Sequence, residues 1–202
     1  MEDALGDSSG ILLVAGTGSV AFGRGPTGTF ARCGGWGPQC GDEGGGYWLG
    51  RRALSAITAA SDGREPETSL TGAIITTTEC ESVEELSGWA ATAGVRQVAR
   101  LASTVMSESE NGDLRASALV TLAAEELIVH VRTLARQLFG DERAAVNVAL
   151  SGGLLGRGSA LRKRVEQRLK SAVPGATLLQ DEVVPARGAV KKARRALSVG
   201  TI

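Results

Sequence analysis

A glycine-rich segment near the start of the chain most strongly limits what the chain can fold into. Seven of the thirteen residues at 34–46 are glycine. Because glycine loses more conformational freedom on ordering than any other residue, such a run does not continue a helix or a strand. The segment therefore predicts a long loop, with strand-like patterns before it and helical periodicity after it.

The residues before this loop predict a β-meander. Residues 11–15 form a continuous apolar run that stops at Gly16, which is typical of a buried strand ending in a turn. Residues 19–24 and 29–33 predict two further strands, and Gly25-Pro26-Thr27-Gly28 between them is typical of a hairpin turn.

The residues after the loop are mostly helical in pattern. Helices are predicted at 47–60, 82–93, 95–107 and 113–139, whereas 68–77 suits a helix or a strand. The end of the chain predicts a strand at 145–150, a helix at 154–172 and a strand at 176–179. Pro185-Ala186-Arg187-Gly188 then leads into a last helix, which ends at about Leu197. We therefore expect an α/β fold in one lobe, residues 1–202, with a helical insertion. Its segments are 10–48 (meander and loop), 49–140 (mostly helical) and 145–202 (α/β).

Charge and composition exclude several classes of protein. Lys+Arg and Asp+Glu are both 22, and this balance argues against binding to nucleic acid or to an anionic membrane. No apolar stretch has the length of a membrane span, and the polar start does not resemble a signal peptide, so we expect a cytoplasmic protein. The spacing of Cys33, Cys40 and Cys80 favours neither a disulfide framework nor a metal site. We interpret His130 as a residue at the edge of the core or on the surface, and the basic residues at 157–170 as a solvated helix face.

Two short glycine motifs are candidates for binding a nucleotide. The glycines of Gly16-Thr17-Gly18-Ser19 let backbone N–H groups approach phosphate oxygens, although an ordinary hairpin turn has the same composition. Ser151-Gly152-Gly153 follows a predicted strand and precedes a predicted helix, where nucleotides often bind in α/β proteins. A plain strand-to-helix loop is the alternative for that second motif.

The glycine-rich loop carries side chains that a flexible linker would lack. Trp36 can lie against the apolar face of a sugar ring, and the carboxylates of Asp42 and Glu43 can accept hydrogen bonds from sugar hydroxyls. The alternative is structural, with Trp36 and Trp48 in the core and Asp42 capping the following helix. It suits Tyr47 and Trp48, which lie within the helical pattern, better than Trp36, which has glycines on both sides.

In their order and spacing these motifs resemble the N-acetylglucosamine kinase and BadF/BadG/BcrA/BcrD-type ATPase family. The matching residues are Gly16-Thr17-Gly18-Ser19, Gly34-Gly35-Trp36-Gly37, Gly41-Asp42-Glu43-Gly44 and Tyr47-Trp48, with weaker matches at Asn111-Gly112-Asp113, Ser151-Gly152-Gly153 and Gly188-Ala189. The resemblance implies a ribonuclease-H-like (actin-like ATPase) lobe that uses ATP and Mg2+. It also implies that Gly16, Thr17, Gly18 and Ser19 bind phosphate, that Gly35, Trp36, Gly37 and Asp42 bind an amino sugar, and that Gly152 and Gly153 bind adenosine.

The same resemblance implies a kinase that phosphorylates N-acetylglucosamine or a related amino sugar, often as a homodimer. In the family, a preceding lobe supplies the first phosphate loop and the catalytic aspartate, so we expect this chain to be a C-terminal half that lacks the catalytic base. Two alternatives stay open. One is an ATPase that activates a partner redox enzyme, and the other is a non-catalytic module that binds sugar or nucleotide.

Overall fold

The computed structural model describes residues 1–199, so the last three residues of the expected 145–202 segment lie outside the described part. Its elements, in chain order, are α1 (Glu2–Leu5), β1 (Gly10–Ala15), β2 (Ser19–Arg24), β3 (Phe30–Gly34), α2 (Gly46–Ser61), α3 (Leu70–Thr78), α4 (Val83–Thr92), α5 (Val95–Glu110), α6 (Leu114–Phe139), β4 (Val146–Ser151), the 3-10 turn η1 (Gly153–Leu155), α7 (Ala160–Ala172), β5 (Ala176–Leu178) and α8 (Pro185–Val199).

The strands form a five-stranded sheet in the order β3-β2-β1-β4-β5. β2 runs antiparallel to β1 and to β3, whereas β4 is parallel to both β1 and β5. In the centre, Leu12 of β1 lies opposite Phe22 of β2 on one side and Ala149 of β4 on the other. The apolar run predicted as a buried strand is this central strand, which is buried along nearly its whole length.

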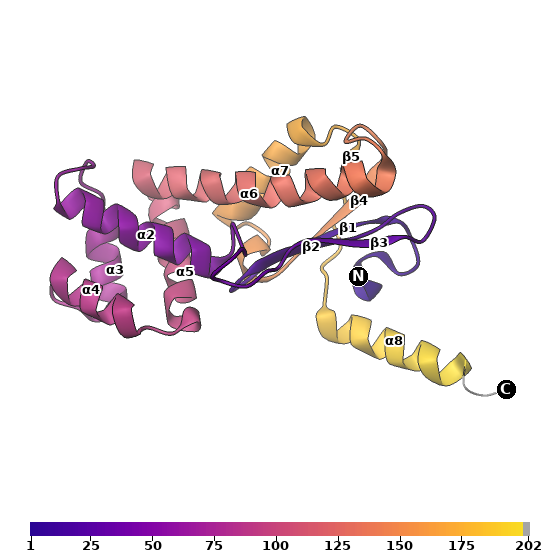
Figure 1. Ribbon diagram of the computed structural model, residues 1–202, viewed down its shortest axis with the longest axis horizontal. Helices are drawn as coiled ribbons and strands as arrows, with labels where there is room; N and C mark the ends of the chain where they lie inside the picture. Colours follow the sequence, from indigo (N-terminus) through magenta and orange to yellow (C-terminus); the bar gives the residue numbers. More distant parts are fainter. Residues whose placement is uncertain (200–202) are drawn as a thin grey trace.

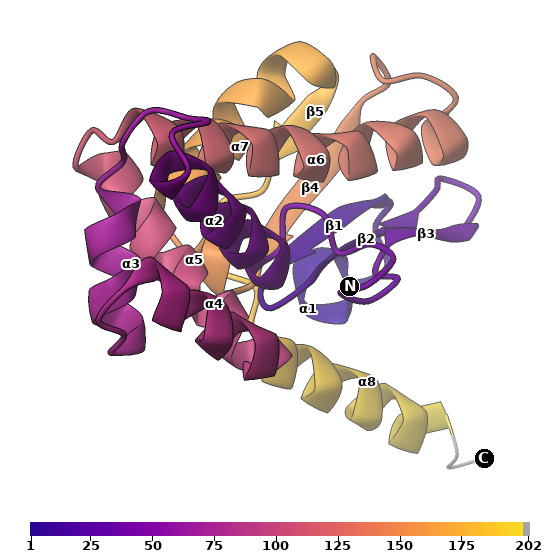
Figure 2. The same cartoon turned by 60° about the vertical axis from the view of Figure 1, so that its left-hand side comes forward.

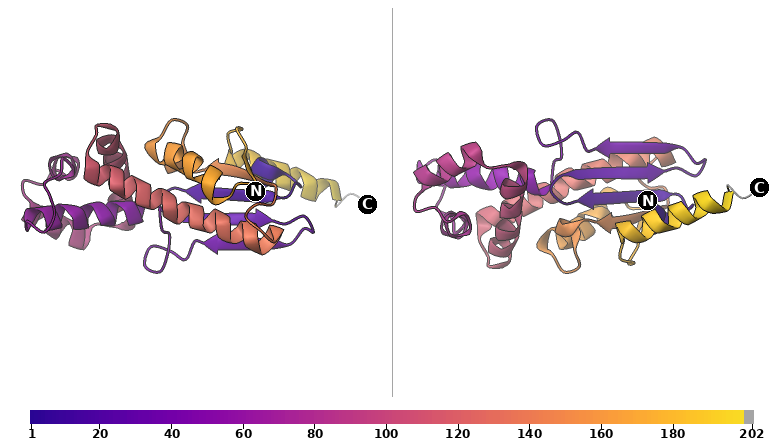
Figure 3. Two further views of the ribbon diagram at one scale, coloured as in Figure 1. Left: turned by 90° about the horizontal axis from the view of Figure 1, so that it is seen from above. Right: turned by 90° about the horizontal axis from the view of Figure 1, so that it is seen from below.

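Helices cover the sheet on both faces (Figures 1 and 2). α6 crosses one face over β1, β2 and β3 and packs beside α7, whereas α1 and α8 lie on the opposite side. Helices α2 to α5 form a separate group beyond one end of the sheet, and α6 runs from this group across the strands (Figure 3). This arrangement confirms the α/β class with a helical insertion.

The long helix α6 holds the sheet and the helical group together. Leu119, Ala123, Leu127, Val131 and Leu134 recur at helical spacing, and all five are buried. Each buried leucine of this stripe contributes about 1.5–3 kcal/mol of transfer free energy. The helix begins where Asp113 accepts a hydrogen bond from the Ala116 backbone N–H at 2.7 Å, and it ends at Gly140 in a left-handed conformation.

Two predicted boundaries were wrong. The helix expected at 154–172 is a 3-10 turn at Gly153–Leu155 followed by α7 from Ala160, because Gly156 and Gly158 interrupt it and Ser159 caps the new helix. The last helix begins earlier than expected, at Pro185, whose fixed φ suits a first helical turn. The ambiguous segment 68–77 is helical, with Leu70 and Ile74 buried one turn apart. No described helix is long and apolar enough to cross a membrane.

Candidate active site

The turn between β1 and β2 is tied to the start of α2 by main-chain hydrogen bonds. The backbone N–H of Gly46 donates to the carbonyl of Gly16 at 2.8 Å, and that of Tyr47 donates to Thr17 at 2.9 Å. The turn closes on itself through a bond from the Gly16 N–H to the Gly18 carbonyl at 2.9 Å. The turn and the amino end of α2 are therefore one rigid corner of the molecule.

The carboxylate of Asp42 lies directly against this corner. A Cβ added at Gly18 would overlap the Asp42 carboxylate, so only glycine allows this approach. Asp42 Oδ1 also accepts a hydrogen bond from the Gly37 backbone N–H at 3.2 Å. The backbone of Asp42 is left-handed, with φ 60°, a conformation that side chains other than glycine adopt mainly at functional sites and turns.

Asp42 does not cap the helix that follows it. The N-cap residue of α2 is Gly45, and no side chain caps the start of this helix by accepting a hydrogen bond from its backbone N–H groups. The structural alternative for Asp42 is therefore wrong, because its carboxylate is held inside the loop beside Gly18 rather than at the helix end.

The two tryptophans of this region lie in different environments. Trp36 is 71% exposed, and the guanidinium carbon of Arg32 lies 4.7 Å from the centre of its ring. Trp48 is half-buried and packs against the core, with Arg52 5.0 Å from its ring centre. The structural alternative is therefore correct for Trp48, whereas Trp36 presents a free aromatic surface beside the loop.

His130 of α6 supports the loop from beneath. The residue is 6% exposed, and its Nε2 lies 3.9 Å from Glu43 Oε2. Burial lowers the pKa of His130 below its ordinary value, and the facing carboxylates of Glu43, Glu126 and Asp42 act in the opposite direction. The sequence predicted a position at the edge of the core or on the surface for this histidine. It did not predict its contact with the loop, because nothing in the pattern of α6 points to a segment so far away in the chain.

Ser19 also holds the loop. Its side chain is buried, and its hydroxyl donates to the Glu43 carbonyl at 2.6 Å. The hydroxyl is thus engaged with the loop, and we expect any contribution of Ser19 to phosphate binding to come from its backbone.

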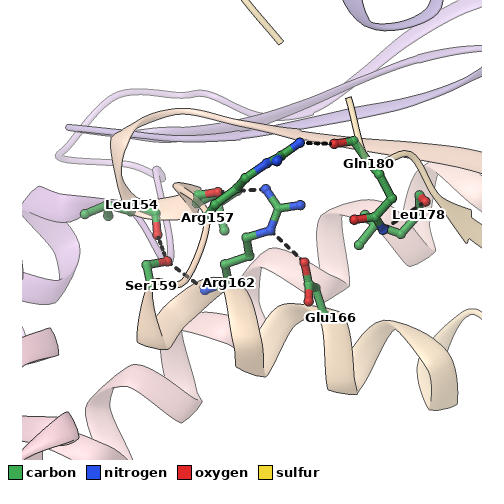
Figure 4. Close-up of polar contacts among 8 residues, drawn as sticks. Leu154, Arg157, Ser159, Arg162, Glu166, Leu178 and Gln180 are labelled. Atoms are coloured by element: carbon green, nitrogen blue, oxygen red, sulfur yellow. Dashed lines mark hydrogen bonds and ion pairs between the residues drawn. The ribbon is translucent and has the colours of Figure 1, made fainter. Parts of the chain in front are cut away.

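The second glycine motif follows β4, next to β1. Gly152 has φ 98° and lies against the backbone of Ala15, the last residue of β1. The segment after it is anchored on its far side (Figure 4): the Ser159 hydroxyl donates to the Leu154 carbonyl at 2.8 Å, and Arg157 donates to the Gln180 carbonyl at 2.7 Å. Arg162 donates to the Leu155 carbonyl and pairs with Glu166 at 2.6 Å. The motif is therefore fixed at the carboxyl end of the sheet.

An open cleft of about 370 Å³ joins the two glycine motifs. It lies between the β1–β2 turn, η1 and α5, and its lining residues are Gly16, Thr17, Arg96, Ala99, Arg100, Ser103, Met106, Gly153 and Leu154. Its volume is within the usual range for small-molecule sites. Neither Asp42 nor Gly35 lines the cleft: Asp42 lies against Gly18 in the adjoining turn, and Gly35 lies against Val20.

Metal ligands do not gather at this site. Among residues 1–199, no three His, Cys, Asp or Glu side chains are close enough to hold an ion together. Cys33, Cys40 and Cys80 are free thiols.

Comparison with known proteins identifies similar chains. The chain is 32% identical over 187 residues to an N-acetylmuramic acid/N-acetylglucosamine kinase of Clostridium acetobutylicum, covering 92% of this chain and 61% of the relative. It is 27% identical over 183 residues to an N-acetyl-D-glucosamine kinase of Dictyostelium discoideum, covering 89% of this chain and 57% of that protein. The chain thus spans about three fifths of the length of the curated relatives it matches.

Solved structures show the same fold. A Chromobacterium violaceum protein, provisionally assigned as an N-acetylglucosamine kinase, superposes with a TM-score of 0.75 at 32% identity, over 93% of this chain and 60% of its own. A Porphyromonas gingivalis structure superposes with a TM-score of 0.62 at 20% identity, over 94% of this chain and 62% of its own, and supports the fold alone. These matches confirm the expected actin-like, ribonuclease-H-like lobe. A model of the BadF/BadG/BcrA/BcrD ATPase family matches residues 1–193, and the chain belongs to that family.

Proposed function

We propose that this chain forms the nucleotide- and sugar-binding part of an ATP-dependent kinase for N-acetylglucosamine or a related amino sugar. The observation that carries the proposal is the contact of Asp42 with Gly18, because it joins the candidate sugar loop to the candidate phosphate turn. A sugar hydroxyl that donates to Asp42 would lie beside the phosphates held at the turn. Phosphoryl transfer depends mainly on such positioning of acceptor and donor.

Each candidate residue has a distinct role in this proposal. The backbone N–H groups of the turn Gly16, Thr17, Gly18 and Ser19 would donate to phosphate oxygens, and Gly152 with Gly153 would lie against adenosine. Trp36 would cover the apolar face of the sugar, while Asp42 and the backbone of Gly35 and Gly37 would orient its polar groups. When it is bound with ATP, Mg2+ would neutralise charge on the phosphates.

The proposal leaves the general base to a residue outside this chain. We infer that a preceding lobe supplies it, and that the complete kinase forms a homodimer. Activation of a redox partner is the weaker alternative, because the three cysteines do not gather with one another or with other ligands in the described part of the chain.

The test is ADP release by the chain with ATP, Mg2+ and N-acetylglucosamine, compared with reactions lacking sugar. Sugar binding is measured alongside by calorimetry. Asp42→Asn keeps the size of the side chain but removes its charge, and we expect it to abolish sugar binding and, with it, any turnover that the wild-type chain shows. Asp62→Asn is the matched control, because Asp62 is an exposed carboxylate at the other end of α2 that pairs with Arg64.

The outcomes separate the alternatives. Turnover that requires sugar and is lost only in Asp42→Asn supports a kinase that works with this chain alone. Sugar binding without turnover supports a binding module or a half that needs its partner lobe. If wild-type protein binds no amino sugar, the assignment of the loop is wrong.

A further inference from the structure

Two arginines of α5 line the cleft beside the glycine motifs. Arg96 and Arg100 are four residues apart, so they lie on the same face of the helix. Both side chains line the cleft that is also bounded by Gly16, Thr17 and Gly153. A pair of positive charges therefore faces the two segments proposed to hold the nucleotide.

Neither arginine has a partner within the described residues. No described carboxylate pairs with them, although two other exposed arginines of this chain do pair, Arg136 with Glu142 and Arg168 with Glu125. The two guanidiniums are also the only charged groups among the residues that line the cleft. The wall formed by α5 thus has positive charge without a counter-charge.

This placement opposes the local electrostatics of the helix. Like charges at i and i+4 destabilise a helix, and cations in its first turn interact unfavourably with the helix dipole. The first turn of α5 contains no acidic residue to offset Arg96. The backbone N–H of Gly94, just before the helix, donates to Gln97 Oε1 at 2.7 Å, and this bond does not involve either arginine. Helix stability therefore does not account for the two arginines, whereas an anionic ligand in the cleft does.

We propose that Arg96 and Arg100 bind the phosphate chain of the nucleotide, from the side opposite the β1–β2 turn. The inference rests on the proposed use of ATP. The planar guanidinium presents a fork of N–H donors that matches phosphate oxygens. The turn contributes backbone donors and the arginines contribute charge, so the polyphosphate is held between two surfaces. Adenosine, which lacks phosphate, makes no use of the pair.

The test is calorimetric titration of the 202-residue chain with ATP, ADP and adenosine. The variants are Arg96→Gln, Arg100→Gln and the double variant. The control is the double variant Lys192→Gln with Arg194→Gln, which removes the same charge from exposed positions of α8, a helix that packs on α1 and does not line the cleft.

We expect each single variant to raise the Kd for ATP and for ADP about tenfold, and the double variant about a hundredfold, because hydrogen bonds to charged groups are strong. The Kd for adenosine and for N-acetylglucosamine should stay within about twofold, and so should every value for the α8 control. Because both side chains are exposed and unpaired, the variants should unfold at the wild-type temperature, which a thermal melt verifies.

Three results would overturn the inference: wild-type protein that binds no ATP, an unchanged ATP affinity in the double variant, or an equal loss of adenosine affinity. The kinase assignment fails separately. If ATP binding depends on the two arginines but no sugar is phosphorylated or bound, the proposed kinase is wrong and this nucleotide contact stands. If sugar-dependent turnover persists with an unchanged KM for ATP in the double variant, the kinase stands and the arginine contact is wrong.

Discussion

Gly152 and Gly153 are neighbours, but substitution by alanine should affect the stability of the protein very differently at the two positions. The backbone of Gly152, at φ 98° and ψ 156°, is in a region that is populated almost only by glycine. Its new Cβ would also meet three backbone atoms of Ala15, all at 3.0 Å or less. Gly153, in contrast, has no atom within 4 Å of an added Cβ and has no positive φ.

The backbone conformation of Gly152 and its contact with Ala15 determine how much stability Gly152→Ala should lose. Placing alanine in that backbone region costs about 1–3 kcal/mol. Forcing a methyl group against the main chain of a central strand adds about 1–3 kcal/mol. We therefore expect Gly152→Ala to lower the free energy of unfolding by about 4 kcal/mol, a large part of the usual stability of a single domain. Gly153→Ala should change it by less than about 0.5 kcal/mol.

Urea unfolding followed by circular dichroism measures both values, and ATP titration adds a second comparison. Gly153 lines the cleft proposed to hold the nucleotide, so its added methyl group should weaken ATP binding in a protein of normal stability. The reasoning is refuted if Gly152→Ala costs less than about 1 kcal/mol, or if the two variants lose similar stability. Unchanged ATP affinity in Gly153→Ala would contradict the placement of adenosine against this motif.

Three further predictions address the loop and the helix ends. Because burial lowers the pKa of His130, the unfolded chain binds this proton more readily, so the free energy of unfolding should fall as the pH drops through the ordinary histidine pKa of about 6.5. Urea titrations at several pH values should show a weaker pH dependence for His130→Asn than for the wild-type protein. An equal pH dependence in the two proteins would contradict this role of His130. Asp113→Ala removes the cap of α6 and the acceptor of the Ser69 N–H at 2.8 Å, and chemical denaturation should show a loss of about 2 kcal/mol. A loss no larger than that of the exposed control Asp62→Ala would show that the cap contributes little. Trp36→Ala should leave the melting temperature unchanged but weaken sugar binding in calorimetry, since this ring is 71% exposed; a large drop in melting temperature would show that the ring packs against the protein.

Much of the fold could be predicted from local pattern. The apolar run at 11–15 is the central strand β1, and the meander, the glycine-rich loop and the helices that follow were placed within a few residues. These elements have strong local signals: glycines that end strands, a Ser82 cap bonded to the Glu85 N–H, and apolar residues at helical spacing.

The sequence-based predictions failed where the local pattern and the tertiary contacts favour different structures. Leu154 and Leu155 continue the apolar spacing of α7, but they are buried in a separate 3-10 turn because two glycines follow them. The parallel pairing of β1 with β4 joins segments separated by the whole helical group, and no local signal encodes it.

The candidate site was predicted in its parts but not in its assembly. The motifs themselves identified the loop, the turn and the second glycine pair. The contact of Asp42 with Gly18 and the burial of His130 under Glu43 needed the structure, since each depends on how distant segments pack. Arg96 and Arg100 carry no signal in the sequence, because exposed arginines on an amphipathic helix are common.

The main-chain bonds from Gly46 to Gly16 and from Tyr47 to Thr17 have an evolutionary consequence. They fix the spacing between turn and loop through atoms that every non-proline residue possesses, so mutation of the surrounding side chains leaves that spacing intact. Residues such as Trp36, on the outer side of the loop, are free to diversify without moving the turn. In the proposed kinase, such substitutions would alter the acceptor site one residue at a time while the phosphate turn stays in place.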